Sequence, residues 1–362
     1  MLTFVPDNQT DMRFIIVHIG TTIRLLTGAA LAASLFLLPS CGADGRRAAG
    51  AETGSQQHLP ASKGLPFEMV VIAPQLAYEG ELADSVDMLL RCSTPVLPQH
   101  EPLFRLNVVW ADGNLTPWRT YRSRLVLDID PHAPAHSAIG VARNHVARPQ
   151  LEIKVTGRST HELAQQLGLY KERLRNLLVD HELDCMAAEL RRKYSLPTAK
   201  ALKEVAGHTI CVPPGLKASK RAPHFLWTGT NLNDKDQNFV FYAYDWDGRP
   251  LTLTTAVAKR DSALGVNIPG SRPDQWMQTA RDAQTHRPLV VSRARVINKR
   301  YVHELHGLWE MRNGALGGAF VSLERIDTAA RRVLVTEGFI YSPYSPKRNL
   351  LRQMEAALRT WQ

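Results

Sequence analysis

Residues 149–167 read PQLEIKVTGRSTHELAQQL, and the spacing of their apolar side chains changes within the stretch. Residues 151–155 alternate between apolar and polar side chains, which is the pattern of a half-buried strand. Ser159 and Glu162 have the S-x-x-E spacing of a capping box, in which each side chain satisfies an exposed backbone donor. A long helix is predicted to follow as far as Tyr194. A strand followed by an amphipathic helix indicates mixed α and β structure.

The predicted helix has one apolar face, because apolar residues recur at steps of three and four. Its face is formed by Leu163, Leu167, Tyr170, Leu174, Leu178, His181 and Cys185. Before it, the sequence predicts a buried strand at 67–73, a helix at 83–91 and extended segments at 103–109 and 124–129. After Pro197 the pattern restarts with a strand at Thr209–Val212, and further strands are predicted at 225–228, 239–244, 289–297, 303–311, 319–326 and 332–341. A helix at 251–264 and a final helix from about Lys347 complete the pattern, the last with an apolar stripe at Leu350, Leu351, Met354, Leu358 and Trp361.

Both parts of the chain therefore open with a strand and finish on an amphipathic helix. We predict an α+β fold of two related halves, each a mainly antiparallel sheet packed with amphipathic helices. The expected divisions are a lipoprotein signal peptide at 1–40, a flexible tether at 41–58, an N-terminal α+β half at 59–205 and a C-terminal α+β half at 206–362.

The composition is that of a soluble, basic protein. Hydrophobic residues make up 44% of the chain and charged residues 22%, which excludes a disordered or fibrous protein. The net charge is +10, from 44 Lys and Arg against 34 Asp and Glu. A basic surface favours anionic partners, such as acidic lipid or a cell-wall polymer. No recognisable nucleic-acid module occurs, so no nucleic-acid partner is expected.

The N-terminal segment has the pattern of a secretory signal. Residues 25–38 carry no charge, and Arg13 and Arg24 precede them. A helix of that length spans about 21 Å, which is less than the ~30 Å hydrocarbon core of a bilayer. Leu38-Pro39-Ser40-Cys41 looks like a bacterial lipobox, in which the cysteine thiol is acylated and the leader is cut before it. Cys41 is thus the predicted lipidation site, and ordinary cleavage nearby with a free thiol is the alternative.

Beyond Cys41, residues 42–58 contain almost no large apolar side chain and read as a tether. Gly42 is not the aspartate associated with retention in the inner membrane, so a lipid anchor in the outer membrane of a cell envelope is expected. The other cysteines, Cys92, Cys185 and Cys211, allow one disulfide at most and lack zinc-like spacing.

A set of short motifs occurs in order along the chain. They are Leu97-Pro98-Gln99, Glu101-Pro102 with Phe104, Arg148-Pro149-Gln150, Phe225-Leu226-Trp227, Arg260-Asp261, Ile268-Pro269-Gly270, Gly307-Leu308-Trp309-Glu310, Gly317-Gly318-Ala319-Phe320, Glu337-Gly338-Phe339-Ile340-Tyr341 and Lys347-Arg348. Together they resemble the domain of unknown function 4837 family, lipoproteins of Gram-negative envelopes, from about Leu59 to the C-terminus. Ala319 stands where the family is expected to have proline, and His306 where it is expected to have arginine. The resemblance implies a lipid-anchored envelope protein and supplies no activity.

The motifs around Trp309 and Glu337 contain the candidate catalytic carboxylates. Glu310 and Glu337 are predicted to be neighbours on adjacent strands, and paired carboxylates can divide acid and base work. Asp261 is a third candidate, and Arg260 and Trp309 are candidate ligand-binding residues beside them. The alternative is structural: a buried Trp, and a carboxylate paired with Arg260, Arg312 or Lys347.

Other combinations of residues contain the side-chain types that are found in ligand or metal sites. Residues 238–246, NFVFYAYDW, put aromatic rings on both faces of a strand, and Tyr242 and Trp246 are candidates for stacking on a ligand. Cross-strand packing is the alternative for these rings. No metal site is predicted, because His303 and His306 point to opposite faces of a strand. Asp130, His132 and His136 fit a solvated turn, and His181 with Cys185 fits a buried pair on a helix.

The sequence contains no nucleotide-binding or serine-hydrolase motif, and no cofactor is expected. The leading hypothesis is a non-catalytic binding or assembly module of the cell envelope, held at the membrane by its acyl chains. Its expected partner is an anionic envelope polymer or an envelope protein. The alternatives are a hydrolase of cell-wall or polysaccharide material that uses paired carboxylates, and a structural envelope component.

Overall fold

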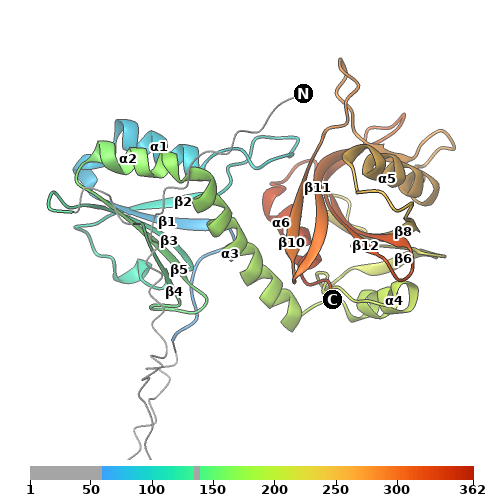
Figure 1. The fold of residues 1–362 in the computed structure, drawn as a ribbon, viewed down its shortest axis with the longest axis horizontal. Coiled ribbons are helices and arrows are strands. Elements are labelled where there is room, and N and C mark those ends of the chain that lie inside the picture. Colours follow the sequence, from blue (N-terminus) through green and yellow to red (C-terminus); the bar gives the residue numbers. More distant parts are fainter. Residues whose placement is uncertain (1–58, 134–138) are drawn as a thin grey trace, which may run out of the picture.

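The computed structural model describes residues 59–133 and 139–362, which form two domains side by side (Figure 1). Cys41, the predicted signal peptide and the predicted tether lie outside the described residues. Helices and strands mix in both domains around two sheets, one of five strands and one of eight. The predicted α+β class and the division into two halves are confirmed.

The N-terminal domain is built on the five-stranded sheet, in the order β2-β1-β3-β5-β4. Its strands are β1 (Glu68–Ala73), β2 (Arg105–Trp110), β3 (Ser123–Ile129), β4 (Ile139–Arg143) and β5 (Leu151–Gly157). The helices are α1 (Gly80–Leu90), α2 (Thr160–Leu169) and α3 (Lys171–Arg192), with short 3-10 turns at Gln75–Ala77 and Thr116–Trp118.

This sheet corrects the prediction that each half is mainly antiparallel. Strand β1 pairs in parallel with β2 and β3, and β3 pairs in parallel with β5, so only the β4–β5 pair is antiparallel. The prediction failed because helix α1 lies between β1 and β2, and a helical crossover brings the next strand back in the same direction. The two halves therefore differ in topology.

The stretch at 149–167 folds as its pattern predicts. Strand β5 alternates between buried and more exposed side chains. The Ser159 hydroxyl accepts the Glu162 backbone N–H at 3.2 Å, and the Glu162 carboxylate accepts the N–H of Arg158 at 2.8 Å. The predicted single helix is two helices that meet at Tyr170. Helix α2 can therefore cover the N-terminal sheet, while α3 continues towards the C-terminal domain (Figure 1).

The C-terminal domain is built on the antiparallel eight-stranded sheet, in the order β10-β11-β12-β13-β8-β7-β6, with β9 paired to β11. Its strands are β6 (Lys217–Ala222), β7 (Phe225–Gly229), β8 (Asp236–Asp245), β9 (Met277–Thr279), β10 (Val290–Ile297), β11 (Arg300–Met311), β12 (Gly317–Asp327) and β13 (Arg332–Tyr341). Its helices are α4 (Leu196–Ala206), α5 (Leu253–Asn267) and α6 (Arg348–Leu358).

Two details of the sequence prediction change here. The predicted boundary puts residues 196–205 in the N-terminal half, but they form helix α4, which packs on β6 and β7 of the C-terminal sheet. The segment Thr209–Val212 was predicted to be a strand, and it is an irregular segment. Its Ile210 and Val212 side chains are buried, and its backbone bonds Ser195 and Thr360 instead of a neighbouring strand.

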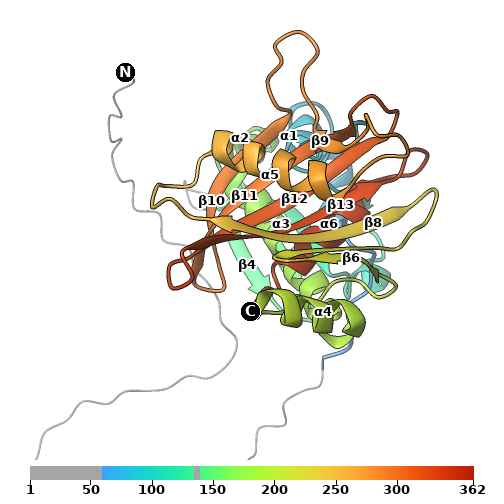
Figure 2. The same cartoon turned by 90° about the vertical axis from the view of Figure 1, so that its right-hand side faces the viewer.

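The C-terminal sheet has a different core on each face. Helix α5 lies across one face (Figure 2), over a cluster that includes Leu305, Trp309, Phe320 and Val335. Helix α6 packs on the other face. The cluster beneath α6 is continuous with the core of the N-terminal domain, so the two domains share one hydrophobic core.

Polar contacts fix the two domains to each other at the same seam. The Glu101 carboxylate accepts the backbone N–H groups of Lys347 (2.6 Å) and Arg348 (2.9 Å) at the start of α6. These N–H groups have no partner inside their own helix, so Glu101 caps it from the other domain. The guanidinium of Arg348 donates to the Pro102 carbonyl at 2.7 Å. Two of the motifs quoted from the sequence thus meet in one interdomain contact.

Candidate functional site

Glu337 and Arg260 form a buried ion pair beneath α5. Two nitrogens of Arg260 donate to the two oxygens of Glu337, at 2.9 and 2.7 Å, and neither residue is more than 1% exposed. Arg260 also donates to the Thr279 hydroxyl at 3.0 Å and lies 3.8 Å above the Phe320 ring. Burial raises the pKa of the Glu337 carboxyl, and the charge of Arg260 opposes that rise. Glu337 is therefore a buried carboxylate that is paired with Arg260, which is the structural role that the sequence offered as the alternative to catalysis.

Glu310 lies far from Glu337, which corrects the prediction that they are neighbours. Strand β12 lies between their strands, with Glu310 opposite Gly317 and Glu337 opposite Ser322. Those two partners are five positions apart, about 17 Å along the strand, and an odd separation puts them on opposite faces. The two carboxylates therefore cannot share a substrate. Hydrophobic periodicity located all three strands, but it did not show that β12 pairs with both of the others and lies between them.

The remaining candidates near Arg260 also have structural partners. Asp261 accepts the backbone N–H and the hydroxyl of Thr279, at 2.7 and 2.6 Å, which ties α5 to β9. Trp309 is 5% exposed and donates its indole N–H to the Ile340 carbonyl at 3.1 Å. The Asp261 contacts fix α5 to β9, and the Trp309 contact fixes β11 to β13.

The two aromatic candidates on β8 have different environments. Tyr242 is buried in the core beneath α5. Trp246 is half-buried and donates to the Arg249 carbonyl at 2.7 Å. It lines a surface cavity of about 490 Å³, together with Tyr244 and Lys259. Of the two, only Trp246 has a side chain that a ligand can reach.

The histidines behave largely as their spacing predicted. His303 and His306 bond different carboxylates on opposite faces of β11. His181 and Cys185 form a buried pair, with the sulfur 3.7 Å from Nε2. Burial lowers the pKa of His181 to about 4 and raises that of Cys185 to about 12, so both are neutral near pH 7. His136 lies outside the described residues. Cys92, Cys185 and Cys211 are free thiols.

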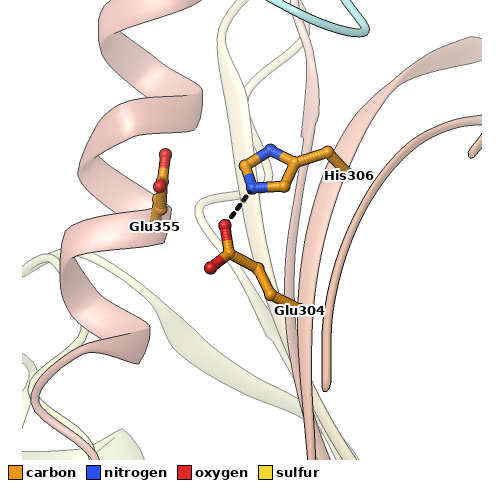
Figure 3. Close-up of side chains that lie close together, drawn as sticks. All are labelled: Glu304, His306 and Glu355. Carbon is orange, nitrogen blue, oxygen red and sulfur yellow. Dashed lines mark hydrogen bonds and ion pairs between the residues drawn. The ribbon is translucent and has the colours of Figure 1, made fainter. Parts of the chain in front are cut away.

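A cluster of buried titratable groups lies between β11 and α6. Figure 3 shows Glu304 and His306 reaching from β11 towards α6, which carries Glu355. One ligand-type atom from each residue lies within 4.8 Å of the others. His306 Nε2 and Glu304 Oε1 are 2.6 Å apart. Arg352, one turn before Glu355 on α6, donates to Glu355 Oε2.

Arginines from β10 complete this cluster. Arg293 donates to Glu304 Oε1 at 2.7 Å, and Arg295 lies 3.6 Å from Oε2 of the same carboxylate. Arg295 also donates to Asp180 on α3 at 2.9 Å, which joins the cluster to the N-terminal domain. Burial alone raises the pKa of Glu304, but the hydrogen bond and charge of His306, followed by the charge of Arg293, lower it well below its ordinary value.

The pKa of Glu355 is also lowered. Burial works against ionisation, and the charges of Arg352 and then His306 outweigh it. Both glutamates of the cluster are therefore ionised near neutral pH. One oxygen of Glu355 and the Nε of Arg352 are buried without a partner among the described residues. Buried groups of this kind ordinarily bond water or a ligand.

Two carboxylates and an imidazole are donor types that suit zinc, so the fit of a metal can be tested on this cluster. An ionised Glu304 only accepts, so His306 Nε2 must carry the proton between them, and that nitrogen has no lone pair to offer. Arg293, Arg295 and Arg352 already supply positive charge to the two carboxylates. With both glutamates ionised and the His306 Nε2 protonated, the carboxylates hold the arginine side chains in position. Their negative charge is already balanced, so the cluster does not favour a metal cation.

Those guanidinium groups face a cavity at the seam between the domains. The cavity has a volume of about 370 Å³. It is lined by Cys92, Ser93, Pro95 and Leu103 after α1, by Glu172, Arg175, Asn176 and Val179 of α3, by Val291, Ser292, Arg293 and Arg295 of β10, by His306 of β11 and by Arg352 of α6. Both domains thus contribute walls to it, and interdomain cavities of this size are common ligand sites.

Comparison with known families assigns the two domains separately. Residues 195–360 match the model of DUF4837, a domain of unknown function. The C-terminal domain belongs to the DUF4837 family. Residues 62–191 match a second model, DUF8532, which is also a domain of unknown function. The DUF4837 match thus covers the C-terminal domain, and motifs before residue 195 fall in the segment that the DUF8532 model matches. No curated protein matches the chain significantly.

Within the described residues, no helix is long and apolar enough to cross a membrane. The segment that matches the DUF4837 model supplies β10, β11 and α6 to the cavity, and the segment that matches the DUF8532 model supplies α3 and the residues after α1. Sequence analysis missed this site because Arg293, Arg352 and Glu355 stand in no motif. One signal was present: His306 replaces an arginine expected in the family, and it lines the cavity.

Proposed function

We propose that this protein is a lipid-anchored, non-catalytic binding module of the cell envelope, and that its ligand binds in the interdomain cavity. The observation that carries the proposal is the cavity itself, because charged side chains from both domains are held in fixed positions around it. The lipobox-like segment ending at Cys41 supports the membrane anchor, and the tether supports a position near the membrane surface.

Binding is favoured over hydrolysis by the positions of the carboxylates. Glu310 and Glu337 lie on opposite faces of the sheet, and Glu337 is held by Arg260. At the cavity, Glu304 and Glu355 are each engaged by an arginine, so neither is free to serve as a general base. A preformed cavity between two domains with a shared core suits recognition of a ligand without large motion.

The anchor is tested by mass spectrometry of the mature protein from membranes. The expected N-terminal peptide begins at an acylated Cys41, and an unmodified thiol or an uncut leader would contradict the anchor. The binding site is tested by placing a photo-crosslinking amino acid at Asn176, which lines the cavity, and at Asn233, an exposed loop residue outside it. Irradiated envelopes should give a discrete adduct from position 176 alone. Equal labelling from both positions, or none, would refute the cavity as the site.

A further inference from the structure

The interdomain cavity is lined by more positive than negative side chains. Four arginines line it, at positions 175, 293, 295 and 352, and Glu172 is the one acidic residue among the described lining residues. The carboxylates of Glu304 and Glu355 bond the arginines without lining the cavity. This arrangement fixes the guanidinium groups while leaving the ligand-facing side positive.

Several of these guanidinium groups have donors to spare. A guanidinium carries five N–H donors. Among the described residues, Arg295 donates one hydrogen bond, to Asp180, and Arg352 donates one, to Glu355. Arg352 is only 5% exposed, and its Nε is buried without a hydrogen-bond partner among the described residues. An unsatisfied buried donor on a cavity wall indicates that an acceptor belongs there.

We infer that the cavity binds a phosphate group, and that the remainder of the ligand molecule contacts the apolar part of the cavity wall. Phosphate matches guanidinium groups bidentately, and it offers more charge and more oxygens than a carboxylate does. Leu103, Val179 and Val291 supply the apolar wall. The inference rests on the proposed function, because it names the ligand class of the same cavity. The phosphate can come from a soluble phosphorylated compound or from a phospholipid head group.

Asn176 gives a sharp test, because Asn176→Asp changes one charge and almost no volume. Asn176 is an exposed residue of α3 that lines the cavity, so the variant should fold normally. A negative charge added to the cavity wall should repel a bound phosphate and weaken its binding about tenfold. Asn233→Asp, outside the cavity, is the matched control and should leave the affinity unchanged.

Binding is measured by calorimetry on the mature protein in neutral detergent. The soluble probe is pyrophosphate, and the lipid probe is a short-chain phosphatidylglycerol, with the zwitterionic phosphatidylcholine as its comparison. At least one anionic probe should bind, more weakly at high salt, and Asn176→Asp should weaken it while Asn233→Asp does not. The probe that binds identifies the source of the phosphate.

The inference is overturned if neither anionic probe binds, or if both Asn→Asp variants weaken binding equally. Photo-crosslinking from position 176 separates this failure from that of the proposed function. An adduct from position 176 without binding of either phosphate probe would leave the cavity as a site and exclude phosphate as its ligand class.

Discussion

Replacing Arg260 by methionine should destabilise the C-terminal domain severely, because it leaves the Glu337 carboxylate without a counter-charge in the core. Glu337 is fully buried, and both of its oxygens are bonded by Arg260. Removing one partner of such a pair costs about 3–5 kcal/mol. For a domain of this size that corresponds to a fall in melting temperature on the order of 10 °C. Methionine fills much of the arginine volume, so the charge dominates the effect.

The double variant Arg260→Met with Glu337→Leu distinguishes a paired charge from a loss of packing. With both charges removed, the free energy of unfolding of the double variant should lie within about 2 kcal/mol of the wild-type value. Apolar replacements of buried ion pairs often leave stability unchanged. Thr279 loses its bond to Arg260 but keeps its bond to Asp261. Arg249→Met is the matched control, because Arg249 is exposed. The assay is urea-induced unfolding followed by tryptophan fluorescence.

Two outcomes would refute this reasoning. If Arg260→Met has the same free energy of unfolding as the wild type, Arg260 and Glu337 are not a charged pair in the core. A double variant as unstable as the sum of the two single variants would mean that the side chains act through packing alone. Either result would reopen Arg260 and Glu337 as residues held in place for a ligand.

Two further predictions concern packing and acid stability. A Cβ at Gly318 would lie 2.0 Å from the Ile340 carbonyl oxygen, so Gly318→Ala should lower the free energy of unfolding by about 1–3 kcal/mol or more in the same urea assay, whereas Gly168→Ala, with open space around it, should cost nothing. Burial lowers the pKa of His181 and His208 to about 4, so the unfolded chain takes up protons between pH 6.5 and 4 that the folded chain does not. Stability should therefore fall on acidification across that window, by about 3 kcal/mol for each histidine. Urea unfolding at pH 7 and pH 4.5 measures this loss, and equal stabilities at the two pH values would contradict it.

Local patterns in the sequence predicted most of the elements. The alternation at 151–155 and the Ser159–Glu162 spacing specify a strand and a helix start through contacts within a few residues, and both are present. The apolar stripe of the last helix is likewise confirmed, with Leu351, Met354 and Leu358 buried. These features depend on neighbours along the chain, which the sequence displays directly.

Arrangements that depend on distant partners were not predictable in the same way. The parallel pairing of β1 with β2 and β3 depends on how the connections cross the sheet, and the position of β12 between β11 and β13 separated Glu310 from Glu337. The cavity site combines residues from α3, β10, β11 and α6, and none of these segments carries a motif for it. Only the tertiary fold brings those side chains together.

The shared core gives helix α6 an unusual position in the order of folding. Every other helix and strand of the structure precedes it in the chain, yet its Leu351 and Met354 complete a core that includes residues of both domains. Its first turn is capped by Glu101, which emerges from the ribosome far earlier. The core that the two domains share is therefore complete only once α6 has been synthesised. The contact between Glu101 and the start of α6 therefore links the folding of the N-terminal domain to the synthesis of a helix about 250 residues further along the chain.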